Sequence, residues 1–129
     1  MGKEETTQMR TMQLLENVEF HEREPNAEPL FVDQYGRVIR FSLKPGQVIR
    51  EHSAGGSPFY AVVVKGSGIF VGAGGEERHV APNTLLIFEP GEEHEVRAGD
   101  EELVFVGFLH GVPGTRPDHV GGELGRASQ

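Results

Sequence analysis

The most informative stretch of this chain is Gly46-Gln47-Val48-Ile49-Arg50-Glu51-His52, in which a glycine opens a short β-prone run that ends in a histidine. A second glycine-bearing segment that ends in a histidine, Glu89-Pro90-Gly91-Glu92-Glu93-His94, follows further along the chain. Valine and isoleucine favour strands, whereas glycine next to proline favours turns. Both histidines are therefore expected on strands beside turns. An all-β chain that brings two imidazoles into one barrel has the beginnings of a metal or small-ligand pocket.

Around these segments, short runs of Val, Ile, Phe and Leu alternate with turn signals such as Lys44-Pro45-Gly46, Gly66-Ser67-Gly68 and Pro82-Asn83. The pattern predicts strands at residues 29–33, 37–43, 47–53, 58–65, 68–72, 76–81, 84–89, 94–98 and 102–109. Short strands at this spacing, without a long helical window, are typical of a β-sandwich or β-barrel. We therefore expect an all-β fold.

The 129 residues are expected to form one domain with an extension at each end. Residues 1–27 are polar with a few spaced apolar side chains, which suits one or two helical turns or an irregular arm. Residues 28–110 hold the predicted β-barrel. Residues 111–129 are rich in glycine and poor in apolar side chains, so we expect a flexible or partner-docked tail.

Composition excludes several classes of function. The net charge of −8 opposes binding to nucleic acid and to anionic membranes, and no apolar run reaches the length of a membrane span. The chain contains no cysteine, which excludes disulfides and thiolate chemistry and fits the reducing cytoplasm. No helix is expected after the glycine-rich turns, so they are not phosphate-binding loops, and no nucleotide cofactor is expected.

Residues 59–64 and 103–109 are apolar at consecutive positions instead of alternating. Strands of this kind are usually covered on both faces. A second copy of the chain is the simplest outer cover, so a homodimer is expected. Cover by the N-terminal arm alone is the alternative.

The first histidine segment resembles the first motif of the cupin superfamily, G(X)5HXH(X)3–4E(X)6G. Gly46, His52 and Gly66 match that motif. Ala54 stands where the family has its second histidine, and Phe59 stands where the family has its glutamate.

The second segment resembles the second cupin motif, G(X)5PXG(X)2H(X)3N, through Gly91 and His94. Asn83, Glu89 and Ala98 stand at the opening glycine, the proline and the final asparagine. The resemblance covers about residues 37–109 and implies a small single-domain, RmlC-like cupin. The implied fold is a double-stranded β-helix, or jelly-roll barrel, with a degenerate metal motif.

The resemblance implies one divalent transition metal ion, Fe, Mn, Ni or Zn, with His52 and His94 as ligands. Ala54 offers no lone pair and Phe59 offers no negative charge, whereas a catalytic metal generally has three protein ligands. His110, at the end of the last predicted strand, is the candidate for a third ligand.

Two functions follow from the resemblance. The preferred one is a cupin barrel that binds a small molecule in a pocket formed by His52, Ala54, Phe59, Phe88 and His94. The alternative is a metal-dependent cupin enzyme, a dioxygenase or an isomerase, that uses His52 and His94 plus a third ligand.

Two further interpretations stay open. One is a metal-free isomerase or epimerase in which one histidine transfers a proton with help from Tyr60. The other assigns no function to the two histidines and treats them as hydrogen-bonded polar groups in a wet pocket.

Overall fold

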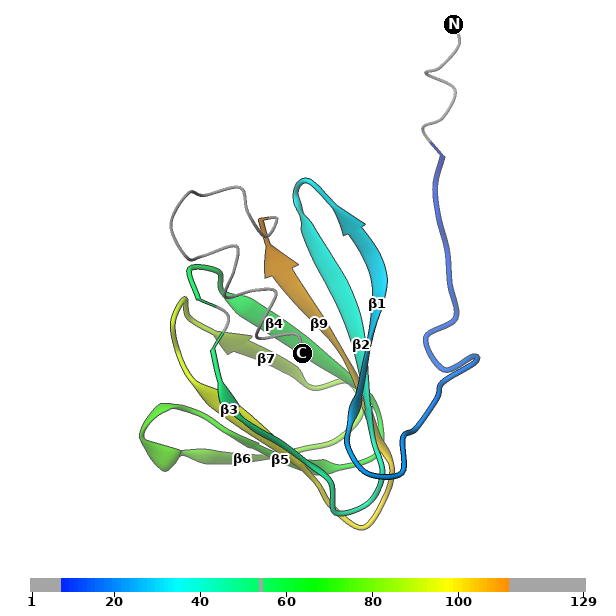
Figure 1. Ribbon diagram of the computed structural model, residues 1–129. Helices are drawn as coiled ribbons and strands as arrows, with labels where there is room; N and C mark the ends of the chain where they lie inside the picture. Colours follow the sequence, from blue (N-terminus) through cyan, green and yellow to red (C-terminus); the bar gives the residue numbers. More distant parts are fainter. Residues whose placement is uncertain (1–7, 54, 112–129) are drawn as a thin grey trace, which may run out of the picture.

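The structure is a computed structural model that describes residues 8–53 and 55–111, with Glu51 and His52 described by their backbone alone. It consists of two antiparallel sheets that face each other (Figure 1). The five-stranded sheet has the order β1 (Asn26–Asp33), β2 (Gly36–Leu43), β9 (Leu103–His110), β4 (Phe59–Lys65) and β7 (Leu85–Phe88). The four-stranded sheet has the order β3 (Val48–His52), β8 (His94–Ala98), β5 (Gly68–Val71) and β6 (Glu77–Val80).

The nine predicted strands are all present, and the all-β prediction is confirmed. The largest difference lies in β1, which begins at Asn26 instead of residue 29. Asn26, Ala27 and Glu28 are poor strand formers, but they pair with residues 40–42 of β2. Pairing with a neighbouring strand therefore outweighs their local preference.

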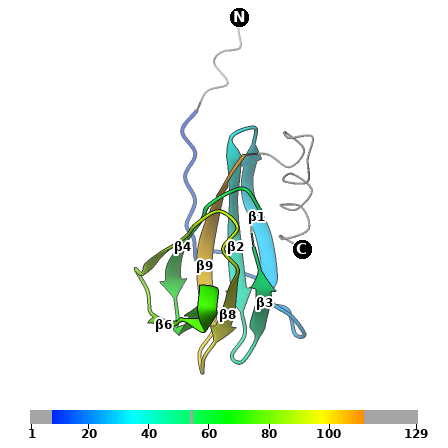
Figure 2. The ribbon, with the colours of Figure 1, turned by 90° about the vertical axis from the view of Figure 1, so that its left-hand side faces the viewer.

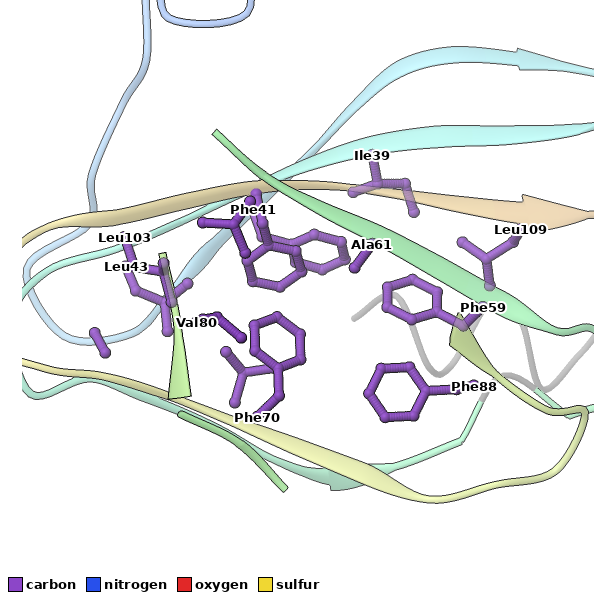
Figure 3. Close-up of a cluster of buried hydrophobic side chains, with 14 residues drawn as sticks. Ile39, Phe41, Leu43, Phe59, Ala61, Phe70, Val80, Phe88, Leu103 and Leu109 are labelled. Carbon is purple, nitrogen blue, oxygen red and sulfur yellow. The ribbon is translucent and has the colours of Figure 1, made fainter. Parts of the chain in front are cut away.

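The core lies between the sheets and is built by alternation along each strand. Ile39, Phe41 and Leu43 of β2 are buried, as are Phe59 and Ala61 of β4. Figure 3 shows Phe59, Phe88 and Leu109 at one end of this core and Leu43 and Leu103 at the other. Aromatic rings fill the middle, where Phe41 stacks on Phe105 with centroids 4.7 Å apart.

One end of the sandwich gathers the segments that carry the predicted site. Strands β3, β7 and β9 finish there, while β2, β4 and β8 begin there. We call this the site end; in Figure 1 it is the upper end of the five-stranded sheet. Because the motif histidines, Phe59 and Phe88 are terminal residues of their strands, the topology places all four of these positions at the site end.

The N-terminal arm, residues 8–25, is irregular apart from a turn and runs beside the five-stranded sheet (Figures 1 and 2). Arg40 fastens it, because its guanidinium donates hydrogen bonds to the carbonyls of Leu14, Glu16 and Asn17 at 3.0–3.2 Å. The same guanidinium forms an ion pair with Glu28 at 2.7 Å. The arm is thus held by its backbone, and its side chains are left largely exposed.

Cover on the outer face of the five-stranded sheet is uneven. Val104 and Val106 of β9 are buried, but Phe108 of the same strand is 38% exposed. On β7, Leu85 is 59% and Ile87 is 63% exposed. The arm therefore covers only part of this apolar face. From position 112 on, the predicted tail lies outside the described residues. The part of the chain that the structure describes contains no helix that could cross a membrane.

Candidate functional site

The two motif histidines occupy paired positions on adjacent strands. β3 and β8 run antiparallel, and His52 is the register partner of His94, with an irregularity in β3 between Ile49 and His52. Paired residues of antiparallel strands have Cβ atoms about 5 Å apart. The two segments that the sequence analysis singled out are therefore brought together by strand pairing.

His94 lies inside the sandwich, with 2% of its surface exposed. Its imidazole stacks on Phe59, with centroids 4.8 Å apart and planes 9° apart, and on Phe88, at 4.5 Å and 27°. Phe59 and Phe88 are 6.2 Å apart, so the three rings form a compact group. The structure thus brings together three of the five residues predicted to line a ligand pocket.

Gly107 of β9 makes room for the ring of Phe59. A Cβ atom at Gly107 would lie 2.6 Å from two atoms of that ring and 3.1 Å from the ring of Phe41. Real Cβ atoms essentially never lie as close as 2.6 Å to another atom, so the ring of Phe59 would have to shift if residue 107 carried a side chain. The placement of Phe59 beside His94 therefore depends on a residue 48 positions further along the chain.

A continuous row of paired residues crosses the inner face of the five-stranded sheet at the site end. Arg37 is paired with Leu109, Leu109 with Phe59, and Phe59 with Phe88. Arg37 is half-buried, and burial lowers the pKa of its guanidinium. The sequence analysis missed Arg37. Arg37 lies two residues before Ile39, in a strand whose alternate residues are apolar. This alternation is the signal that could have identified Arg37 as a residue of the inner face.

The loop between β3 and β4 is fastened to the last strand by Ser57, which is 3% exposed. Its hydroxyl accepts a hydrogen bond from the backbone N–H of His110 at 2.8 Å and donates one to the carbonyl of Pro58 at 2.6 Å. This anchor fixes the chain just before Phe59. Ala54, the remaining predicted pocket residue of this loop, lies outside the described residues.

A cavity of about 360 Å³ lies between β6 and β7, the edge strands of the two sheets. Its apolar lining comes from β5, β6 and β7, and includes Phe70, Val80 and Phe88. Glu92 lines the cavity and accepts hydrogen bonds from the backbone of Glu89 at 3.0 Å and of Ala73 at 3.4 Å. Phe88 borders the cavity and also stacks on His94, so one ring connects the cavity to the imidazole.

His110 and Tyr60 lie on the other side of the five-stranded sheet. The neighbours of each in sequence, Leu109, Phe59 and Ala61, are buried in the core, so alternation directs His110 and Tyr60 outward. Their rings contact each other at 5.4 Å. This geometry does not bring His110 to His94 as a third ligand, nor Tyr60 to His94 as a proton-transfer partner.

The residues at the site do not fit a three-ligand metal centre. Phe59 places an aromatic ring against His94 at the position where the cupin motif has its glutamate. Among the side chains that the structure describes, which do not include those of Glu51 and His52, no group of three or more His, Asp or Glu is arranged to hold a metal ion. A ring in van der Waals contact with the imidazole supplies apolar surface in place of charge.

This all-β chain, with its two paired motif histidines, matches the model of a known protein family. The model of the cupin domain matches residues 39–109, and the chain therefore belongs to the cupin family. This agrees with the predicted family and with the predicted double-stranded β-helix. No curated protein matches the chain.

Several solved structures have the same fold as this chain. An uncharacterized conserved protein with a double-stranded β-helix domain from Klebsiella pneumoniae is 22% identical, covers 81% of this chain and 91% of its own, and has a TM-score of 0.75. An RmlC-like cupin protein from Desulfovibrio desulfuricans is 27% identical, with coverage of 79% and 97% and a TM-score of 0.71. A predicted oxalate decarboxylase from Thermotoga maritima is 20% identical, with coverage of 61% and 69% and a TM-score of 0.56.

Proposed function

We propose that this cupin domain binds a small, partly apolar organic molecule at the site end, in the pocket that the sequence predicts from His52, Ala54, Phe59, Phe88 and His94. The observation that carries the proposal is the parallel stack of Phe59 on His94, at 4.8 Å. It gives the centre of the site an aromatic surface where a metal-binding cupin has a carboxylate.

The chemistry of the described residues suits such a ligand. Small-molecule pockets are mostly apolar, with a few polar groups that fix orientation. Phe59 and Phe88 offer apolar surface, while an imidazole can both donate and accept a hydrogen bond. The cavity of about 360 Å³ that reaches Phe88 supports an approach from the open edge of the sandwich. The lack of cysteine fits the cytoplasm as the place of action.

The competing function is a metal-dependent cupin enzyme. The pairing of His52 with His94 favours it, because ligands on adjacent strands can share one ion. The resemblance of the fold to a predicted oxalate decarboxylase also favours it. The position of Phe59 counts against it, since the ring occupies the place of the third protein ligand.

A fragment screen by ligand-observed NMR tests the proposal, with small aromatic and aliphatic acids, amides and alcohols as probes. Fragments should bind to the wild-type protein and lose binding in His52→Ala, with a stability cost below about 1 kcal/mol. His21→Ala removes an exposed imidazole of the arm and serves as the control, with unchanged binding. Absence of any bound fragment, or binding that ignores His52→Ala, would contradict the proposal. A stability loss of about 3 kcal/mol in His52→Ala would mark a structural group instead.

A further inference from the structure

A second cavity, of about 400 Å³, lies between the N-terminal arm and the outer face of the five-stranded sheet. We call it the arm cavity. The arm contributes the apolar side chains of Met12 and Leu14, and β1, β2 and β9 contribute five more, which include Val38 and Phe108. The volume is within the range of about 300–1,000 Å³ of small-molecule sites. Because Phe59 lies on the inner face of the same sheet, the arm cavity is separate from the histidine pocket.

An irregularity in β1 shapes the floor of the arm cavity. Pro29 pairs with Ile39 and Phe31 pairs with Val38, so Leu30 is an extra residue in the register of β1 against β2. In a regular strand, two consecutive side chains point to opposite faces. Here Leu30 and Phe31 both line the arm cavity, which is what a bulge achieves. Two apolar side chains are thereby directed to the outside of the sheet, where one is expected.

Arg10 gives the arm cavity its charge. Its guanidinium carbon lies 4.9 Å from the centroid of the ring of Phe31. Such a cation–π contact leaves N–H donors of the guanidinium for an anion. Among the described residues that line the cavity, Arg10 is the one charged residue, in a chain with 20 acidic and 12 basic residues. The cavity therefore combines apolar walls with one positive charge, although the chain as a whole is acidic.

The wall that the arm provides is fixed at one point and adjustable at another. The carbonyl of Leu14 accepts a hydrogen bond from the guanidinium of Arg40 at 3.1 Å, which holds this part of the arm against the sheet. Met12, two residues earlier, is 50% exposed. A methionine side chain is unbranched and adapts to the shape of what it contacts. The arm can therefore close on an apolar ligand without losing its anchor.

We propose that the arm cavity binds a fatty acid of medium chain length, with the hydrocarbon chain against Phe31, Val38 and Phe108 and the carboxylate at Arg10. Guanidinium groups bind carboxylates through two parallel hydrogen bonds. The volume of the cavity has room for about a dozen atoms, each of the size of a water molecule. A second copy of the chain is the other candidate to cover this face. It does not account for a cation placed among apolar walls, whereas a fatty acid does.

Isothermal titration of the full chain with hexanoate, octanoate and 1-octanol tests this site. Octanoate should bind about 10-fold more tightly than hexanoate, because two further methylene groups leave water. It should also bind more tightly than 1-octanol, since the alcohol cannot form the charged pair with a guanidinium. Nuclear Overhauser effects from the chain of octanoate to the methyl groups of Leu30 and Val38 should place the ligand in the arm cavity.

Variants separate the two parts of the site. Arg10→Met should weaken the binding of octanoate about 10-fold and leave the binding of 1-octanol unchanged. Phe108→Glu puts a negative charge into the apolar wall and should abolish the binding of octanoate. Phe108 is 38% exposed, so we expect this variant to fold, with an unchanged circular dichroism spectrum. Arg23→Met changes an exposed arginine of the arm that does not line the cavity, and as the matched control it should bind like the wild type.

The results that would overturn this inference are distinct from those that would overturn the proposed function. Absence of bound octanoate at millimolar concentration overturns the site. Equal binding of octanoate and 1-octanol, or unchanged octanoate binding in Arg10→Met, overturns the fatty acid as the ligand. Octanoate binding that is lost in His52→Ala belongs to the histidine pocket, which supports the proposed function and overturns the arm cavity. A dimer in sedimentation velocity that excludes octanoate, and that dissociates in Phe108→Glu, shows that a second copy of the chain occupies the cavity instead.

Discussion

The imidazole of His94 lies parallel to the ring of Phe59, with centroids 4.8 Å and planes 9° apart. His94 is the first residue of β8 and Phe59 is the first residue of β4, and these two strands belong to different sheets. The contact therefore joins the two sheets at the site end. The ring also stands at the sequence position of the glutamate in the cupin motif, so apolar surface lies against the imidazole there.

Phe59→Ala should destabilise the protein by about 3–5 kcal/mol, measured by urea denaturation. Phe59 is 4% exposed and contacts the rings of Phe41, Phe88 and His94, so the substitution leaves a cavity between the sheets. Tyr35→Ala, at a side chain 75% exposed, should change the stability by less than about 0.5 kcal/mol. A cost below about 1 kcal/mol for Phe59→Ala would show that the stack does not join the sheets.

Gly107→Ala should cost about 1–3 kcal/mol through overcrowding and should displace the ring of Phe59. The new methyl group would lie 2.6 Å from that ring, whereas at Gly99 the nearest atom would be 3.7 Å away. Gly99→Ala is therefore the control. The ring-proton chemical shifts of His94 report the displacement, since they depend on the stacked ring. Unchanged shifts in a folded Gly107→Ala protein would contradict this geometry.

The fold could be predicted because its signals are local. Apolar alternation and turn residues placed nine strands, and the spacing of Gly46, His52, Gly91 and His94 indicated the family. Local sequence also put Phe59 and Phe88 near the site. The orientation of the ring of Phe59 could not be read in this way, because it depends on the space that Gly107 leaves on another strand.

Arg37 and the arm show a second limit of local patterns. The sequence gives the position of Arg37 in a strand, but strand pairing decides that it shares a row with Phe59. Similarly, the apolar residues of β9 indicated a covered outer face without indicating what covers it. The arm is held on this sheet because the guanidinium of Arg40 binds three of its carbonyls. Neither the shared row nor the anchoring of the arm can be read from nearby residues, because each joins segments that are far apart in the sequence.

Arg40→Met should release the arm. The substitution keeps an apolar stem but removes the hydrogen bonds to Leu14, Glu16 and Asn17 and the ion pair with Glu28. We expect a loss of about 2–4 kcal/mol in unfolding free energy and faster hydrogen exchange in residues 8–25. Arg78→Met, at an exposed ion pair, should leave exchange in the arm unchanged. Wild-type exchange in Arg40→Met would contradict the anchoring role.

The attachment of the arm should also weaken in acid. The hydrogen bond and the positive charge of Lys44 lower the pKa of Glu22 from its usual value of 4.5. A lowered pKa in the folded state means that this contribution is present above pH 4.5 and is lost as the pH falls through the folded-state pKa. An NMR titration of the Glu22 carboxyl should give a pKa below 4.5, and Lys44→Met should restore it. An ordinary pKa in the wild type would contradict the pairing.

The metal content of the purified protein decides between an organic ligand and a metal ion at the paired histidines. The protein is dialysed against a chelator, supplied in turn with Fe, Mn, Ni and Zn, freed of loosely held ions, and analysed by mass spectrometry of the elements. Because Phe59 stands against His94 in place of a carboxylate, we expect well under one retained ion per chain. One tightly held ion per chain, lost in both His52→Ala and His94→Ala, would contradict the proposed organic ligand and favour a metal-dependent enzyme.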